Sequence, residues 1–179
     1  MINRLKKYYA VLFIVIIILV CSALLMGAEK VNRMVLESQQ DPATLALLQQ
    51  IFTDATFYTY SVDTEIYTVY NSGRHKIGYA FYGEGQGYKG RIIVLTGLED
   101  KETIKNIIVI SQSEDLSYWE RMIKQNFFDQ FIGLNVEECY PSFSWLPGGV
   151  DTISGSTVSS RGVIYAVGDA ILDKSDYLD

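Results

Sequence analysis

The longest apolar run of the chain lies near its start. Residues 8–27 (YYAVLFIVIIILVCSALLMG) contain no charged side chain, and about 20 residues of helix cross a hydrocarbon core of about 30 Å. The pattern predicts one transmembrane helix over this range. The alternative is a cleaved secretory signal, but its apolar region is typically about 7–15 residues long and is followed by a cleavage site of small residues.

Basic side chains before this run indicate its orientation. Arg4, Lys6 and Lys7 precede it, and positive charges favour the cytoplasmic side of a membrane. We therefore expect a single-pass protein of the cell (inner) membrane with its C-terminal domain outside the cytoplasm. The expected parts are a cytoplasmic N-terminus, a transmembrane helix, a linker and one extracytoplasmic domain, at residues 1–7, 8–27, 28–40 and 41–179.

The rest of the chain alternates between helical and strand patterns. Apolar residues recur at helical spacing over residues 41–55, where Asp41 suits the N-cap and Pro42 the first helical position. Four runs rich in Tyr, Val, Ile and Thr follow, with short turns between them, which is typical of an antiparallel meander. These runs are TEIYTVYN, HKIGYAFYG, GRIIVLTGL and TIKNIIVISQ.

Three more helical segments are predicted after the strands. The first two cover about residues 117–127 and 128–132, and the last runs from about Thr157 to Leu172. Helices at both ends of such a sheet predict an α+β domain. The expected fold class is thus a small antiparallel β-sheet packed with helices and preceded by one transmembrane helix.

Composition excludes several classes of function. The net charge is -6 and no Lys/Arg cluster lies outside the N-terminus, so nucleic-acid binding is not expected. His75 is the single histidine, whereas catalytic metal sites and Ser-His hydrolases normally draw on histidine, so we expect His75 in a surface turn and no metal site. Two cysteines without a C-x-x-C-H motif also exclude haem attachment and an iron-sulfur cluster.

Residues 85–90 (GQGYKG) match the dinucleotide-binding pattern G-x-G-x-x-G. In a dinucleotide site these glycines end a strand and open a helix, whose N-terminus holds the pyrophosphate. Here the segment RIIVLT follows, which is another predicted strand. We therefore expect a hairpin loop.

A hydroxyl-rich stretch precedes the last predicted helix, since residues 154–162 read SGSTVSSRG. The free N–H groups and positive dipole end of a helix N-terminus favour a phosphate by roughly 0.3 to 2 kcal/mol. Arg161 lies one turn beyond Thr157 on the same side of the helix, where it is able to pair with such a phosphate. The alternative is that Ser154 or Ser156 simply caps the helix, which is a commoner role for serine.

The same stretch resembles a cofactor-attachment motif. Residues 151–157 (DTISGST) are similar to the D-x-x-[ST]-G-A-T motif of FMN-binding domains in the G subunit of Rnf complexes and the C subunit of the sodium-translocating NADH:quinone oxidoreductase. In that family the last Thr carries FMN through a phosphoester bond, which a dedicated flavin transferase installs. Thr157 holds that place here, and Ser156 stands where the family usually has Ala.

Two upstream stretches extend the likeness. Residues 78–100 resemble the family's G-Y-x-F…G-x-G-Y-x-G-x-I…V-G-x-D hairpin, and residues 128–133 (FDQFIG) resemble its F-D-Q-F-x-G stretch. Family members also begin with one transmembrane helix. Residues 111–119 (SQSEDLSYW) depart from the family's H-x-E-T-P-G-L-G loop, which packs beside the flavin ring, and Glu114 is the residue that this segment keeps.

The resemblance implies a membrane-anchored extracytoplasmic flavoprotein that relays electrons through covalently bound FMN. It would act as a subunit of an Rnf-type ion-translocating electron transport complex rather than as a stand-alone enzyme, with the other membrane subunits, the bilayer and the flavin transferase as partners. The alternatives are an orphan FMN carrier for another extracytoplasmic reductase and a flavin-free membrane-tethered structural module. The implied site consists of Thr157 for attachment, Ser154, Gly155, Ser156, Ser159, Arg161 and Glu114 beside the cofactor, and Asp151 with Gly155 for recognition by the transferase.

Overall fold

The computed structural model describes residues 14–22, 40–136 and 149–178. The chain divides into two compact units, Met1–Gln40 and Asp41–Asp179.

Residues 14–22 of the first unit are helical. They lie within the predicted transmembrane range, whose other residues, 8–13 and 23–27, lie outside the described part of the chain. Searching the described residues finds no helix that is long and apolar enough to cross a membrane.

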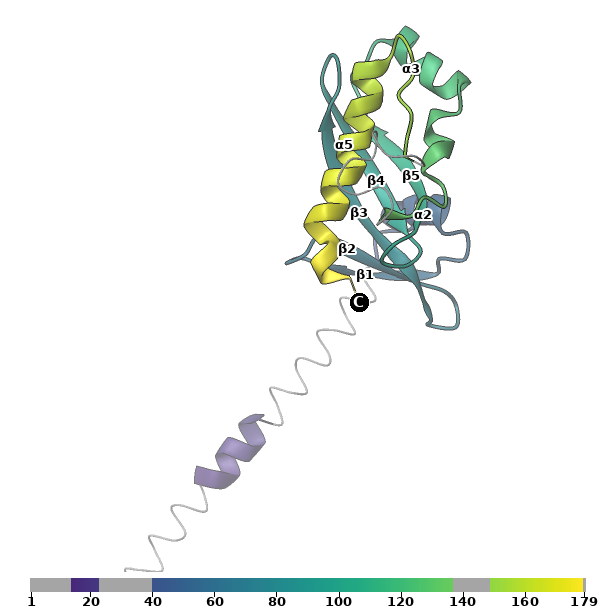
Figure 1. The fold of residues 1–179 in the computed structure, drawn as a ribbon. Coiled ribbons are helices and arrows are strands. Elements are labelled where there is room, and N and C mark those ends of the chain that lie inside the picture. Colours follow the sequence, from purple (N-terminus) through teal and green to yellow (C-terminus); the bar gives the residue numbers. More distant parts are fainter. Residues whose placement is uncertain (1–13, 23–39, 137–148, 179) are drawn as a thin grey trace, which may run out of the picture. The chain divides into compact units, whose positions relative to one another are not determined.

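A five-stranded antiparallel sheet forms the centre of the second unit, with the strands in the order β1-β2-β3-β4-β5 (Figure 1). The predicted meander is confirmed, and β1 is an additional strand at its edge. Its Phe57 ring stacks on that of Tyr70 in β2, with centroids 4.8 Å apart. The strands are β1 Phe57–Ser61, β2 Ile66–Tyr70, β3 Lys76–Gln86, β4 Arg91–Leu98 and β5 Ile104–Ser111.

The predicted helices also form, with small shifts of their ends. Asp41 caps the first of them by accepting hydrogen bonds from the amides of Ala43 and Thr44. This helix ends at Ile51, earlier than predicted, and the apolar residues that follow pack against the sheet instead. The helices are α2 Pro42–Ile51, α3 Leu116–Lys124 and α5 Thr157–Lys174, with short 3-10 helices η1 Phe127–Phe131 and η2 Ser175–Tyr177.

The two faces of the sheet carry separate hydrophobic clusters. On one face α5 runs along β3 and β4 (Figure 1), where Phe81 and Val94 are buried together with Val167 of the helix. On the other face Leu48 and Phe52 from the α2 segment belong to the cluster that covers the centre of the sheet. The order of layers is therefore helix, sheet, helix.

Close contact between α5 and β3 fixes the position of α5 on the sheet. A Cβ atom at Gly83 would overlap the carbonyl oxygen of Ala166, and one at Gly85 would overlap that of Gly162. Without side chains at Gly83 and Gly85, the backbone of α5 lies directly on the strand. The start of α5 is therefore held next to the turn between β3 and β4.

That turn contains the G-x-G-x-x-G pattern. The Gly87 amide donates a hydrogen bond to the Gly90 carbonyl at 2.8 Å, and β4 follows at once. The expectation of a hairpin is confirmed. His75 is exposed and immediately precedes β3, as predicted.

Candidate functional site

The start of α5 is an uncapped helix N-terminus. Ser156 occupies the N-cap position, yet no side chain makes a capping hydrogen bond there. The Ser156 hydroxyl instead donates to the carbonyl oxygen of Tyr118 in α3 at 2.9 Å. The capping alternative for the hydroxyl-rich stretch is therefore not the arrangement found.

The first backbone amides of α5 are free to bind an anion. The Ser160 amide donates to the Ser156 carbonyl at 2.9 Å, but within the described ranges no hydrogen bond joins the amides of Thr157, Val158 or Ser159 to another residue. The Thr157 hydroxyl makes one long bond, 3.4 Å, to the Ile153 carbonyl. These donors, together with the helix dipole, make a site suited to a phosphate.

A tight turn leads into this helix. Gly155 has a φ angle of +77°, a left-handed conformation that favours glycine, and the Ser156 amide donates to the Ile153 carbonyl at 2.9 Å. The exposed Ser154 lies in this turn. Asp151, before the turn, is exposed, and its backbone amide and carbonyl both bond to the Gln130 side chain, at 2.8 and 3.2 Å.

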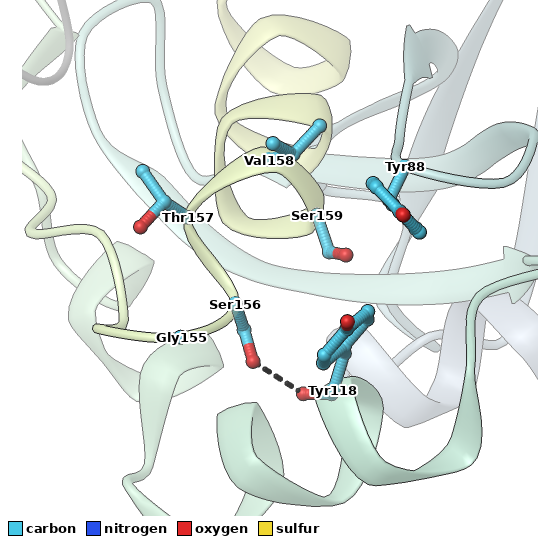
Figure 2. Close-up of a pocket in the computed structure, with 7 residues that line it drawn as sticks. All are labelled: Tyr88, Tyr118, Gly155, Ser156, Thr157, Val158 and Ser159. Carbon is cyan, nitrogen blue, oxygen red and sulfur yellow. Dashed lines mark hydrogen bonds between the residues drawn. The ribbon is translucent and has the colours of Figure 1, made fainter.

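A cavity of about 180 Å³ opens at the start of α5 (Figure 2). Tyr88 of the β3–β4 turn and Tyr118 of α3 form one side, and their rings meet edge to face with centroids 5.5 Å apart. The Tyr88 side chain is 58% exposed, so an aromatic ring is accessible at the mouth. The cavity is lined by Tyr88, Tyr118, Gly155, Ser156, Thr157, Val158 and Ser159.

Glu114 braces the wall of this cavity. Its carboxylate accepts hydrogen bonds from the amides of Tyr88 and Lys89, at 3.0 and 2.9 Å, and from the Ser159 hydroxyl. Burial raises the pKa of Glu114, but the hydrogen bonds from Ser159 and the backbone amides outweigh burial and hold the pKa below its usual value. An ionised Glu114 therefore links the β3–β4 turn to the first turn of α5.

The structure brings most of the predicted site residues together. Gly155, Ser156, Thr157 and Ser159 line the cavity, and Glu114 bonds to its wall. Arg161 is exposed and does not line the cavity, and its side chain forms no hydrogen bond or ion pair with any residue in the described ranges. Its role in binding phosphate stays a prediction.

Sequence patterns did not identify two tyrosines of the site or the residue that anchors the turn. Tyr118 lies in the segment that departs from the family motif, so no motif identified it. Tyr88 lies in the stretch 78–100 that resembles the family hairpin, but the resemblance was not used to assign this tyrosine to the site. Gln130 belongs to the FDQF stretch that resembles the family motif, and its hydrogen bonds to Asp151 give that stretch a structural role.

Comparisons with known proteins find a family match and structural neighbours. Residues 87–172 match the family model of the FMN-binding domain. The crystal structure of Shewanella oneidensis NqrC superposes with a TM-score of 0.51 at 15% identity, over 70% of this chain and 73% of that chain. The C subunit of the Na(+)-translocating NADH-quinone reductase from Parabacteroides distasonis gives a TM-score of 0.47 at 22% identity, over 62% of this chain and 61% of that chain. No protein in the curated set matches the sequence.

The residues at the start of α5 fit FMN. The free amides of Thr157 and its neighbours suit the phosphate, and the accessible ring of Tyr88 suits an aromatic flavin ring. The cavity is small and open, so it accommodates a cofactor that is held at one end. Residues 87–172 therefore match the FMN-binding domain family, FMN is the cofactor that this match supports, and the fold is similar to that of NqrC.

Proposed function

We propose that this protein is an electron-relaying flavoprotein that carries FMN as a phosphoester of Thr157. The observation that carries the proposal is the position of Thr157. It is the first residue of α5 and lines the cavity, and within the described part of the chain its hydroxyl makes a single, long hydrogen bond. A hydroxyl that is so weakly engaged beside free helix amides is well placed to accept a phosphoryl group.

Attachment requires a flavin donor and a transferase. The Thr157 hydroxyl oxygen forms the new bond to the flavin-side phosphorus of a flavin dinucleotide and gives up its proton. The phosphoanhydride bond of the donor breaks, and a nucleoside monophosphate leaves. The exposed Asp151 and the left-handed Gly155 turn present the motif that the transferase recognises.

The protein residues then have a positioning role. FMN supplies reversible electron transfer, while the protein sets its position and electrostatic surroundings. Glu114 keeps the β3–β4 turn, with Tyr88 on it, against the start of α5 through its bond to Ser159. Because Tyr88 is largely exposed, a partner protein has access to this side of the cavity.

We further propose that residues 8–27 anchor the protein in the cell (inner) membrane, with the flavin domain outside the cytoplasm. The uncharged run and the basic residues before it support this topology. The sequence resemblance supports a role within an Rnf-type ion-translocating complex. The altered residues 111–119 favour one second candidate, an FMN carrier for another extracytoplasmic reductase, and genes for complex subunits beside this gene would distinguish the two.

The attachment proposal is tested by intact-protein mass. The full chain is co-expressed with a flavin transferase in cells that supply flavin dinucleotide, as wild type, Thr157→Ala and Ser156→Ala. Wild type and Ser156→Ala should gain the mass of one FMN minus water and fluoresce in a denaturing gel, because Ala is the family's usual residue at 156. Thr157→Ala should show neither signal. An adduct on Thr157→Ala, or none on the wild type, would refute covalent attachment at Thr157.

A further inference from the structure

Helix α3 contacts the turn before Thr157 at two points. The Tyr118 carbonyl accepts the hydrogen bond from Ser156, and Arg121 donates from Nη1 to the Ser154 carbonyl at 3.4 Å. Tyr118 and Arg121 are three residues apart, so they lie on the same side of α3. This side of α3 therefore places a guanidinium at the turn that leads to Thr157.

The guanidinium lies directly against the backbone of this turn. A Cβ atom at Gly155 would overlap Nη1 of Arg121, which puts the positive charge two residues before Thr157. The bond to the Ser154 carbonyl is long, and a guanidinium has five N–H donors. Within the described ranges no carboxylate pairs with Arg121, so most of these donors are available to an anion.

The other cations near the cavity are less suitable. Lys89 is already paired with Asp115, with Nζ and Oδ1 2.5 Å apart. Both Arg121 and Arg161 are exposed and neither lines the cavity. Arg121, however, contacts the turn before Thr157, whereas within the described ranges the Arg161 side chain forms no hydrogen bond or ion pair. Arg121 combines an available positive charge with direct contact to the turn that carries the attachment residue.

We propose that Arg121 holds the phosphate of the attached FMN, opposite the free amides of Thr157 and Val158. The proposal rests on the function proposed above. A phosphate esterified to both flavin and protein keeps one negative charge, and a guanidinium binds two phosphate oxygens at once, which a lysine does not. Arg121 is thus a positioning residue that comes from α3, in the segment following the altered loop.

The test compares wild type with Arg121→Ala, Arg121→Lys and the control Lys124→Ala, each as the full chain with transferase and flavin dinucleotide. Lys124 is an exposed cation of the same helix, and it pairs with Glu120 on the surface. The first readout is the rate at which the FMN adduct appears by intact mass. Arg121→Ala should slow it roughly tenfold, the effect of losing one charge-assisted hydrogen bond. The rate for Arg121→Lys should fall between those of Arg121→Ala and wild type, and the rate for Lys124→Ala should stay within about twofold of wild type.

The second readout is the ³¹P NMR shift of the finished adduct. The shift should move in both Arg121 variants and stay unchanged in Lys124→Ala, because the phosphate senses its hydrogen-bond donors directly. A merely structural role for Arg121 would lower the melting temperature of the unlabelled protein and leave the ³¹P shift in place.

The two proposals fail in distinguishable ways. Absence of the adduct from wild type, or its presence on Thr157→Ala, overturns the attachment proposal. If wild type is labelled at Thr157 but Arg121→Ala matches it in rate and ³¹P shift, the role of Arg121 alone is refuted. The role of Arg121 is also refuted if Lys124→Ala changes the rate and the ³¹P shift as much as Arg121→Ala does.

Discussion

Glu114 shows how a residue of the cofactor motif can act on the protein instead of on the cofactor. The family resemblance predicts that Glu114 lies beside the flavin, because Glu114 is the residue that segment 111–119 keeps from the family loop. In the structure its carboxylate oxygens accept hydrogen bonds from the backbone amides of Tyr88 and Lys89 and from the Ser159 hydroxyl. Its contribution is to hold the cavity wall together, and whether it also contacts the flavin stays a prediction.

The lowered pKa of Glu114 makes a prediction about stability and pH. Because the folded-state pKa lies below the ordinary value of 4.5, the ionised carboxylate stabilises the fold above that pH. This stabilisation is lost as pH falls through the lower folded-state pKa. Glu114→Gln should therefore reduce the free energy of unfolding by about 1–3 kcal/mol at neutral pH, as measured by urea unfolding, and the difference should shrink in acid.

Glu120→Gln is the matched control. Glu120 is exposed and pairs with Lys124 on the surface of α3, so its replacement should change the free energy of unfolding by less than about 0.5 kcal/mol. Equal unfolding curves for Glu114→Gln and wild type at every pH would show that Glu114 braces nothing.

Residue positions in the site divide into those that a motif identifies and those that only tertiary contacts bring in. Thr157 and Gly155 follow from residues 151–157 alone, because the motif is contiguous in sequence. Tyr118 and Arg121 belong to α3, and their relevance depends on α3 packing against the turn before α5. No local pattern specifies that contact.

At the scale of elements, the position of α5 on β3 depends on two glycines. Gly85→Ala should destabilise the domain, because the new Cβ overlaps the Gly162 carbonyl oxygen and must push α5 outward. Overpacking of this kind typically lowers the free energy of unfolding by about 1–3 kcal/mol. The yield of FMN adduct should fall as well, because the displaced end of α5 carries Thr157. Urea unfolding and intact mass measure the two effects.

The neighbouring Glu84→Ala provides the control. Glu84 is exposed on β3 and pairs with Arg91 at 2.7 Å on the surface. Losing this ion pair should lower the free energy of unfolding by about 0 to 1 kcal/mol and leave the yield of FMN adduct unchanged. If Gly85→Ala is as stable as wild type, α5 does not depend on this close approach.

The sequence pattern predicts most helices and strands of the domain, and the two differences, at β1 and α2, have physical causes. The four predicted strands carry their own alternation of β-branched and aromatic residues. Strand β1 is five residues long and is stabilised by its partner, as the stacked Phe57 and Tyr70 rings show. Helix α2 was predicted too long because Phe52 and Ala55 continue the helical spacing, although they pack on the sheet after the helix has ended.

At the scale of the whole molecule, the proposed topology makes a direct prediction. A reporter enzyme that is active only outside the cytoplasm, fused after Asp179, should be active in intact cells, because the basic residues before the apolar run favour the cytoplasm. The same fusion lacking residues 1–27 should be inactive and is the control. A full-length fusion active only with a cytoplasmic reporter would contradict both the topology and the extracytoplasmic electron relay.

The wall of the cavity joins segments that are far apart along the chain. Ser156 bonds to Tyr118 across 38 residues, and Ser159 bonds to Glu114 across 45 residues. A ribosome makes the β3–β4 turn and α3 before it makes α5. During synthesis, the hydrogen bonds that complete the wall therefore form only after α5 has been made. The proposed attachment of FMN therefore follows the synthesis of α5, because a chain that stalls before this helix lacks both Thr157, the proposed acceptor, and the completed wall.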